Sequence, residues 1–202
     1  MPPNTTFESA PTFVAAQTAD GWIDGSAAGS ATNNAFGWWA SPRATGIAVK
    51  FDTVDFHSGT RSLKISTTDI TGRARISCAK QSAGNLTAGS SNSPFLVRCV
   101  PNANYTLTAW VKTNNVATGS ATIALTELNA SFAVGTNIAL TSLTGTNAWA
   151  LVTASGTTTS TGAYLAVGMA NDVAGNISDA WFDDMLLSGP TGYNFTMMGV
   201  GA

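Results

Sequence analysis

Charged side chains are scarce in this chain of 202 residues. Asp, Glu, Lys and Arg make up 10% of it, against about 25% in an ordinary soluble domain. Nine basic and eleven acidic residues leave a formal net charge of −2. The excess of positive charge that binds nucleic acid or an anionic membrane is therefore missing. We expect neither as a partner.

Long apolar stretches are missing as well. No run approaches the roughly 18 apolar residues of a membrane-spanning helix, and the first residues, MPPNTTFESAPTF, lack the basic and apolar regions of a secretory signal. Two origins fit this start. Either a signal has been removed from a secreted protein, or the protein is released by lysis, as virus particles are. We expect a virion surface, with the extracellular space as the alternative.

Histidine and cysteine are rare, which argues against a catalytic centre and a zinc site. His57 is the single histidine and lies two residues before Gly59 in an expected turn, so a turn residue is favoured over a general base. Cys78 and Cys99 form no Cys-x-x-Cys pair. They form either a disulfide, contributing about 3 kcal/mol in the chain-entropy account, or two buried thiols.

Short strand patterns, in contrast, are abundant. Turn clusters such as His57–Gly59, Pro101–Asn104, Thr144–Asn147 and Ser160–Gly162 separate them. This spacing predicts an all-β fold, a two-sheet antiparallel β-sandwich of the jelly-roll type. The expected strands are Thr5–Ser9, Ile47–Thr53, Arg61–Thr67, Ala74–Ala79, Phe95–Val100, Asn104–Thr113, Ala121–Leu128, Asn137–Leu143, Ala148–Ser155, Ala163–Ala170 and Ala180–Leu187. In two of them, alternation predicts core residues on one side and an outward aromatic on the other: Tyr105, Leu107, Ala109 and Val111 inward with Trp110 outward, and Leu165, Val167 and Met169 inward with Tyr164 outward.

Two segments lack this pattern, and together they define the expected domain organisation. Residues 10–46 read as a long loop insertion in a single domain, 1–188, and a loop of this length is usually functional or disordered. Residues 189–202 form an apolar, uncharged tail in which larger side chains alternate with smaller ones, as in an added edge strand. We expect this tail to dock on another subunit, with folding back on its own sandwich as the alternative. The expected anchors are Tyr193, Phe195, Met197 and Met198.

The stretch Ser178–Leu187, SDAWFDDMLL, places two adjacent carboxylates in an apolar strand. Simple alternation puts Trp181, Asp183, Met185 and Leu187 on one face, and Phe182, Asp184 and Leu186 on the other. Asp183 is then expected to point into the core, where it needs hydrogen bonds, a cation or a metal. Carboxylates on opposite faces cannot flank one glycosidic bond as acid and nucleophile. We expect no enzyme.

Four landmarks in a fixed order carry a family resemblance: Phe7-Glu8, the turn Ser58–Leu63, the segment Pro101–Leu107, and Asp183–Leu187. In this order the chain resembles the galactose-binding-like jelly rolls that include xylan- and glucan-binding carbohydrate-binding modules. It departs from their pattern at Asn102-Ala103, where a glycine is usual, and at Met185, where a valine is usual. The resemblance implies the fold more strongly than any function.

The resemblance also implies a structural calcium ion. Its side-chain ligands would be Glu8 and Asp183, with backbone carbonyls near Ser58 and Arg61, a set of oxygens that suits Ca²⁺. In the alternative, Asp183 pairs with Arg61 or Lys64, or accepts backbone N–H bonds.

Aromatic side chains beside small polar residues are the remaining functional signal. Sugars stack their C–H faces on flat rings, so Trp38, Trp39, Trp110 and Tyr164 are candidate glycan-binding residues. Alternatively, Trp38 or Trp39 covers one end of the sandwich and Trp110 lies beneath a loop. Two functions follow. The first is a non-catalytic virion structural or decoration protein of a phage capsid or tail, which assembles with other subunits of a particle or a homo-oligomer and adheres to glycan. The alternative is a carbohydrate-binding module of a secreted polysaccharide-degrading system.

Overall fold

The structure is a computed structural model. It describes residues 34–35, 38–40, 47–67, 74–77, 81–82, 85–86, 96–131, 133–171, 177–190 and 194–196, with side chains described in 52–67, 96–116, 121–131, 133, 135–171 and 177–190. The regular elements in these ranges are all β-strands. Within the same ranges, no helix is long and apolar enough to cross a membrane.

A long curled hairpin organises the fold. Its strands are β9 (Asn104–Asn129) and β10 (Val134–Thr157), which pair antiparallel along most of their length. We expected four strands here, with a turn at Thr144–Asn147, and this was wrong. The chain bends without leaving the ladder: Asn115 and Gly145 take positive φ angles of 55° and 85°, and the register shifts beside them.

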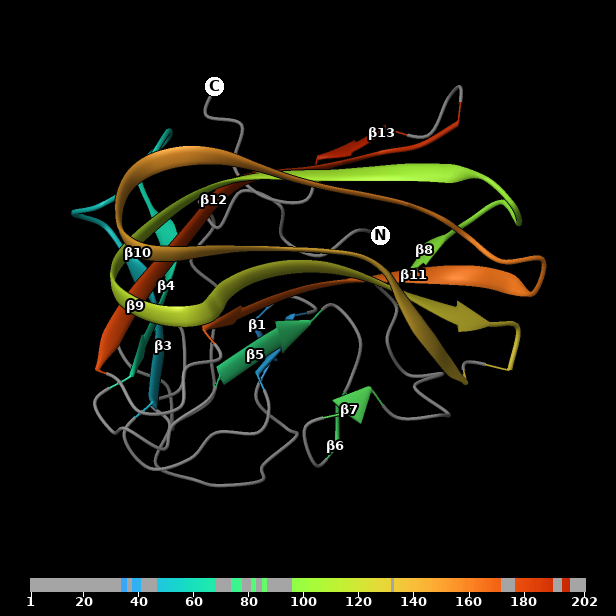
Figure 1. The fold of residues 1–202 in the computed structure, drawn as a ribbon, viewed down its shortest axis with the longest axis horizontal. Helices are drawn as coiled ribbons and strands as arrows, with labels where there is room; N and C mark the ends of the chain where they lie inside the picture. Colours follow the sequence, from blue (N-terminus) through green and yellow to red (C-terminus); the bar gives the residue numbers. More distant parts are fainter. Residues whose placement is uncertain are drawn as a thin grey trace.

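The hairpin carries the chain between two layers (Figure 1). The first half of β9 and the second half of β10 belong to layer one, with β12 (Ser178–Ser188), β4 (Ser62–Thr67) and β3 (Ile47–Asp52). The other halves belong to layer two, with β11 (Gly162–Asn171), β5 (Ala74–Ser77), β8 (Val97–Arg98), β2 (Trp38–Ala40) and β1 (Asn34–Ala35). A separate ladder joins β6 (Gln81–Ser82) and β7 (Asn85–Leu86). All these pairs are antiparallel, so the predicted all-β jelly-roll sandwich is confirmed.

One apolar core fills the space between the layers. The predicted inward residues of β9, Tyr105, Leu107, Ala109 and Val111, are at most 1% exposed, and Leu165, Val167 and Met169 of β11 at most 2%. The alternation in β9 is therefore confirmed, whereas in β11 the expected inward residues are buried but Ala166, on the opposite side of the strand, is buried as well. Each fully buried large side chain contributes about 1.5–3 kcal/mol.

The two halves of β10 also meet each other, which joins the layers along one side of the sandwich. Thr141 Oγ1 donates a hydrogen bond of 2.8 Å to the carbonyl oxygen of Thr153. A Cβ at Gly156 would lie 1.9 Å from the carbonyl oxygen of Ile138, so only glycine fits at this crossing. Contact between the halves shields sheet edges that would otherwise be open to other chains.

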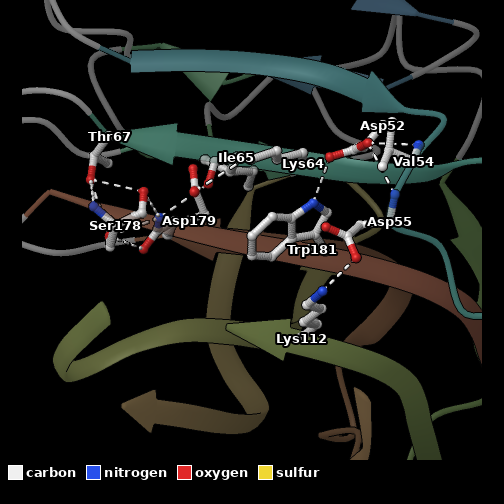
Figure 2. A network of polar contacts seen from close by, with 11 residues as sticks. Asp52, Val54, Asp55, Lys64, Ile65, Thr67, Lys112, Ser178, Asp179 and Trp181 are labelled. Carbon is white, nitrogen blue, oxygen red and sulfur yellow. Dashed lines mark hydrogen bonds and ion pairs between the residues drawn. The ribbon is translucent and has the colours of Figure 1, made fainter. Parts of the chain in front are cut away.

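A buried polar network ties the layers together at another place. Asn171, at the end of β11, donates from Nδ2 to the carbonyl oxygen of Ile65 at 3.1 Å and to Ser178 Oγ at 3.1 Å. Thr67 Oγ1 in turn accepts from the backbone N–H of Ser178 at 3.0 Å (Figure 2). Asn171 is completely buried. Its hydrogen bonds therefore offset a desolvation penalty and link strands from both layers.

Part of the tail forms a strand on its own chain. Residues 194–196, β13 (Asn194–Thr196), pair antiparallel with Leu186–Ser188 of β12, which follows the alternative of local packing. Tyr193, Met197 and Met198 lie outside the described residues, as does the side chain of Phe195.

Several other predictions concern residues that lie partly or wholly outside the described chain. The strand expected at Thr5–Ser9 lies outside it, and β1 and β2 are short strands within the segment expected to be a loop, 10–46.

Cys99 carries a free thiol whose pKa is raised to about 11, chiefly by burial and further by the nearby Glu127. Cys78 lies outside the described residues.

Candidate functional site

The candidate site is built on a bulge in β12. The register of β12 against β9 shifts between Asp183 and Leu186, and Asp184 has a φ of 46°. Phe182 and Met185 therefore both enter the core, and Asp183 and Asp184 lie between them. The simple alternation we predicted is wrong at this point, because the extra residue changes which side chains face inward. As a result both carboxylates reach the same turn, at His57 and Ser58, instead of opposite faces.

Asp183 is completely buried and is compensated by backbone donors. Its Oδ2 accepts the N–H of His57 at 2.8 Å and of Ser58 at 3.2 Å, and its Oδ1 accepts the N–H of Asp184 at 2.9 Å. Burial raises the pKa of Asp183 to about 6; the backbone hydrogen bonds oppose the rise, and the charge of Asp184 adds to it. Asp183 thus fixes the backbone of the turn at some electrostatic cost.

Asp184 holds the side chains of the same turn. Its Oδ2 lies 2.6 Å from His57 Nδ1, and its Oδ1 accepts a hydrogen bond of 2.6 Å from Ser58 Oγ. The two neighbouring carboxylates therefore bind one residue twice: Asp183 holds the main chain of His57 and Asp184 holds its ring.

The ring of His57 stacks on a tryptophan. Its centroid lies 3.8 Å from that of Trp110, with 12° between the planes, and Trp149 approaches edge-on at 5.9 Å and 64°. Trp110 has Asp183 and Leu151 as its partners in the neighbouring strands. The His57 side chain is 29% exposed, and both tryptophans are half-buried. We call His57, Trp110 and Trp149 the aromatic cluster.

A charged network holds the loop that carries His57 (Figure 2). Asp52 Oδ2 accepts the indole N–H of Trp181 at 2.8 Å, and Asp55 forms an ion pair with Lys112. Burial raises the pKa of Asp52, but the hydrogen bonds from Trp181 and two backbone N–H groups outweigh it and lower this pKa. Lys64 Nζ lies 4.4 Å from the Trp181 ring centroid and Lys112 Nζ 5.1 Å. Only 5% of Trp181 remains exposed, so this network supports the loop, and the Trp181 ring presents no open face on which a ligand could stack.

The expected calcium site is only partly within the described chain. Glu8 lies outside it, and Ser58 and Arg61 lie in the turn and at its end, directly before β4. Among the described residues, no group of three or more His, Cys, Asp or Glu side chains could hold a metal ion. Asp183 already accepts three backbone N–H bonds, and Asp184 is bound to His57 and Ser58, so these residues do not by themselves form a calcium site. Calcium bound through Glu8 and Asp183 stays a prediction.

The four residues predicted to bind glycan do not share one layer. Trp110 lies on the outer face of layer one, as predicted. Trp38 and Trp39 lie in β2 of layer two, and their side chains are outside the described set. Tyr164 is also in layer two and packs against the core, although we expected it to face outward. Ala166, on the same side of β11, is completely buried, so that side of the strand is covered too.

Sequence reasoning missed two members of the aromatic cluster. His57 was interpreted as a turn residue, because its partners are distant by 126 and 127 positions and nothing local indicates them. Trp149 had a detectable signal: in AWALVTAS, Val152 and Ala154 face the core, so Trp149, Leu151 and Thr153 share the outer face.

Comparisons with known proteins identify the fold. No protein-family profile matches the sequence, and no curated protein matches it significantly. Among solved structures, the enzymatically active domain of tailspike protein 4 from bacteriophage CBA120 superposes with a TM-score of 0.57 at 11% identity, over 77% of this chain and 20% of that one. This chain thus spans about a fifth of the tailspike chain.

Carbohydrate-binding modules are also among the similar structures. A family 16 module covers 71% of this chain and 87% of its own, with 18% identity and a TM-score of 0.49. A family 4 module covers 76% and 94%, with 14% identity and a TM-score of 0.48. The chain is thus similar, at low identity, to structures of the class that its sequence landmarks resemble.

Proposed function

We propose that this chain is a non-catalytic carbohydrate-binding protein and that the aromatic cluster is its binding site. The observation that carries the proposal is the stack of His57 on Trp110 beside Trp149, on the outer face of a jelly-roll sheet. Flat rings fixed at a partly exposed surface match the apolar C–H faces of a sugar.

Neighbouring side chains supply polar contacts for sugar hydroxyls. Thr108 of β9 and Thr153 of β10 lie opposite each other, directly beyond the pair of Trp110 and Leu151, and on the same outer face. Thr153 is exposed and Thr108 half-buried. An apolar platform with hydroxyl groups at its margin is the combination that binds a sugar ring.

The state of the carboxylates supports binding without catalysis. Glycoside hydrolysis needs two carboxyl groups placed on either side of one bond. Here Asp183 is completely buried, and Asp184 is engaged by the His57 ring and the Ser58 hydroxyl. Both carboxylates position other groups.

Binding can be tested with a matched pair of leucines on β10. Leu151 and Leu140 are each 56% exposed, but Leu151 pairs with Trp110 in layer one and Leu140 pairs with Ala124 in layer two. On a glycan array, Trp149→Ala and Leu151→Ala should lose the glycans that the wild type retains, whereas Leu140→Ala should keep them. Equal loss in both leucine variants, or retention by Trp149→Ala, would place binding elsewhere.

A phage particle is the second part of the proposal, with a secreted polysaccharide-degrading system as the alternative setting. The low content of charge favours an assembled protein, and the tailspike domain is a phage protein with this fold. The partners would be other subunits of the particle. Mass spectrometry of purified particles, together with the solution mass of the isolated chain, tests this setting. A monomer that is absent from particles supports the secreted module.

A further inference from the structure

Asp184 determines which ring nitrogen of His57 carries the hydrogen. A carboxylate accepts hydrogen bonds, so the contact of 2.6 Å between Asp184 Oδ2 and His57 Nδ1 places the hydrogen on Nδ1. Neutral imidazole carries one N–H, which leaves Nε2 as an acceptor. Among the described residues, none forms a hydrogen bond to Nε2, and the side chain is 29% exposed.

The ring is also restrained by its neighbours on more than one side. The backbone N–H of His57 is bound to Asp183, the face of its ring lies on Trp110, and Trp149 packs against the ring at a steep angle. Ser58, the next residue, donates through its hydroxyl to the other oxygen of Asp184. A ring held in this way loses little conformational freedom when a ligand binds.

The bulge in β12 is the structural cause of this arrangement. In a regular strand, Asp183 and Asp184 would point to opposite faces. The left-handed conformation of Asp184, with a φ of 46°, turns its carboxylate to the turn that Asp183 also binds. Asparagine and aspartate tolerate this conformation, and glycine adopts it without strain.

We propose that Asp184 is a positioning residue that fixes His57 with Nε2 as an acceptor, so that the site selects a ligand presenting a hydroxyl donor beside the aromatic cluster. This role deepens the proposed carbohydrate binding and rests on it. The ligand class is a neutral, hydroxyl-bearing ring. A ring whose hydroxyls are methylated offers no donor to Nε2 and therefore binds more weakly.

The tautomer can be read without any ligand. Because His57 is the single histidine of the chain, ¹⁵N spectra of the labelled protein contain one imidazole. At a pH where the imidazole is neutral, the wild type should show hydrogen on Nδ1. Asp184→Gly, which suits the backbone, should move hydrogen to Nε2. Asp184→Asn should keep the wild-type pattern, with its amide oxygen accepting from Nδ1 and its NH₂ group donating to the hydroxyl oxygen of Ser58. Hydrogen on Nε2 in the wild type, or no change in Asp184→Gly, overturns the positioning role.

Ligand selection is then measured with xylohexaose and its O-methylated form as probes. Wild type and Asp184→Asn should prefer xylohexaose by about tenfold, as expected for one hydrogen bond, and Asp184→Gly should lose this preference. Equal preference in all three proteins, with the tautomers as predicted, overturns the selectivity alone. Absence of binding to these probes and to a broad glycan array overturns the proposed function, and the selectivity with it. Melting curves of both variants establish that each is folded.

Discussion

The buried carboxyl group of Asp183 should make the stability of this protein fall as the pH rises. Its pKa is raised from an ordinary 3.8 to about 6, chiefly by burial. Between these values the folded state binds more protons than the unfolded state, and stability therefore decreases with increasing pH. A rise of about two pKa units corresponds to roughly 3 kcal/mol. This contribution is fully present below about pH 4 and is lost by about pH 7.

Asp183→Asn isolates this contribution. Its amide oxygen can still accept the N–H groups of His57 and Ser58, while its NH₂ group replaces the oxygen that accepts the N–H of Asp184. The variant should therefore lose some stability at pH 4 and show no Asp183-dependent slope. Urea unfolding of both proteins at pH 4, 5, 6 and 7 gives the difference in free energy of unfolding. We expect the free energy of unfolding of the wild type minus that of the variant to decrease by about 2 kcal/mol from pH 4 to pH 7, less than the full value because the unfolded carboxyl group is already partly ionised at pH 4.

Asp184→Asn provides a second check, because the charge of Asp184 raises the pKa of Asp183. Removing that charge should move the pH-dependent window downward. A wild-type protein that gains stability relative to Asp183→Asn as the pH rises would refute the reasoning, since the carboxylate would then be stabilised by its N–H donors more than it is penalised by burial.

Three further predictions concern stability. Gly156→Ala should destabilise the fold by about 3 kcal/mol, because the new Cβ would meet the backbone carbonyl of Ile138 at 1.9 Å. In Gly162→Ala the atom closest to the new Cβ belongs to the Glu127 side chain, at 2.7 Å, so this variant should lose less stability in urea unfolding. A larger loss for Gly162→Ala than for Gly156→Ala would contradict the packing argument. Asn171→Ala should cost about 1–3 kcal/mol, because buried groups of Ile65 and Ser178 lose partners, and an unchanged urea midpoint would show that the network is dispensable. Calcium should raise the melting temperature of the wild type and leave that of Glu8→Ala unchanged, as mass action requires for a ligand that binds only the native state. Equal melting temperatures of the wild type with calcium and with chelator would refute the calcium site.

The strands were largely predictable from sequence, because alternation with a period of two is a local property. Tyr105 to Val111 follow it closely, whereas in β11 Ala166 is buried on the side that was expected to face outward. At position 102, where related patterns have glycine, Asn102 takes a φ of 55° and so fills the role of the missing residue. Bends at Asn115 and Gly145 were interpreted as strand ends, because the residues that end a strand also allow a strand to turn a corner.

The candidate site was less predictable, because it depends on one bulge and on contacts across the whole chain. No local pattern distinguishes a regular strand from one in which Asp184 takes a positive φ. Once that bulge is present, Asp183 and Asp184 reach the turn at His57, more than 120 positions earlier. Trp110 was identified from its outward position, whereas Trp149 became relevant only through its edge contact with the His57 ring.

The central claim is that sugar binds at the aromatic cluster, and the ring signals of His57 test it most directly. As the chain has one histidine, its Cε1–H and Cδ2–H resonances report on the cluster alone. Titration with a glycan that the protein retains should shift both resonances saturably, with the same dissociation constant as calorimetry. Retention of the glycan with both resonances unmoved would contradict the claim and place the site away from His57, Trp110 and Trp149.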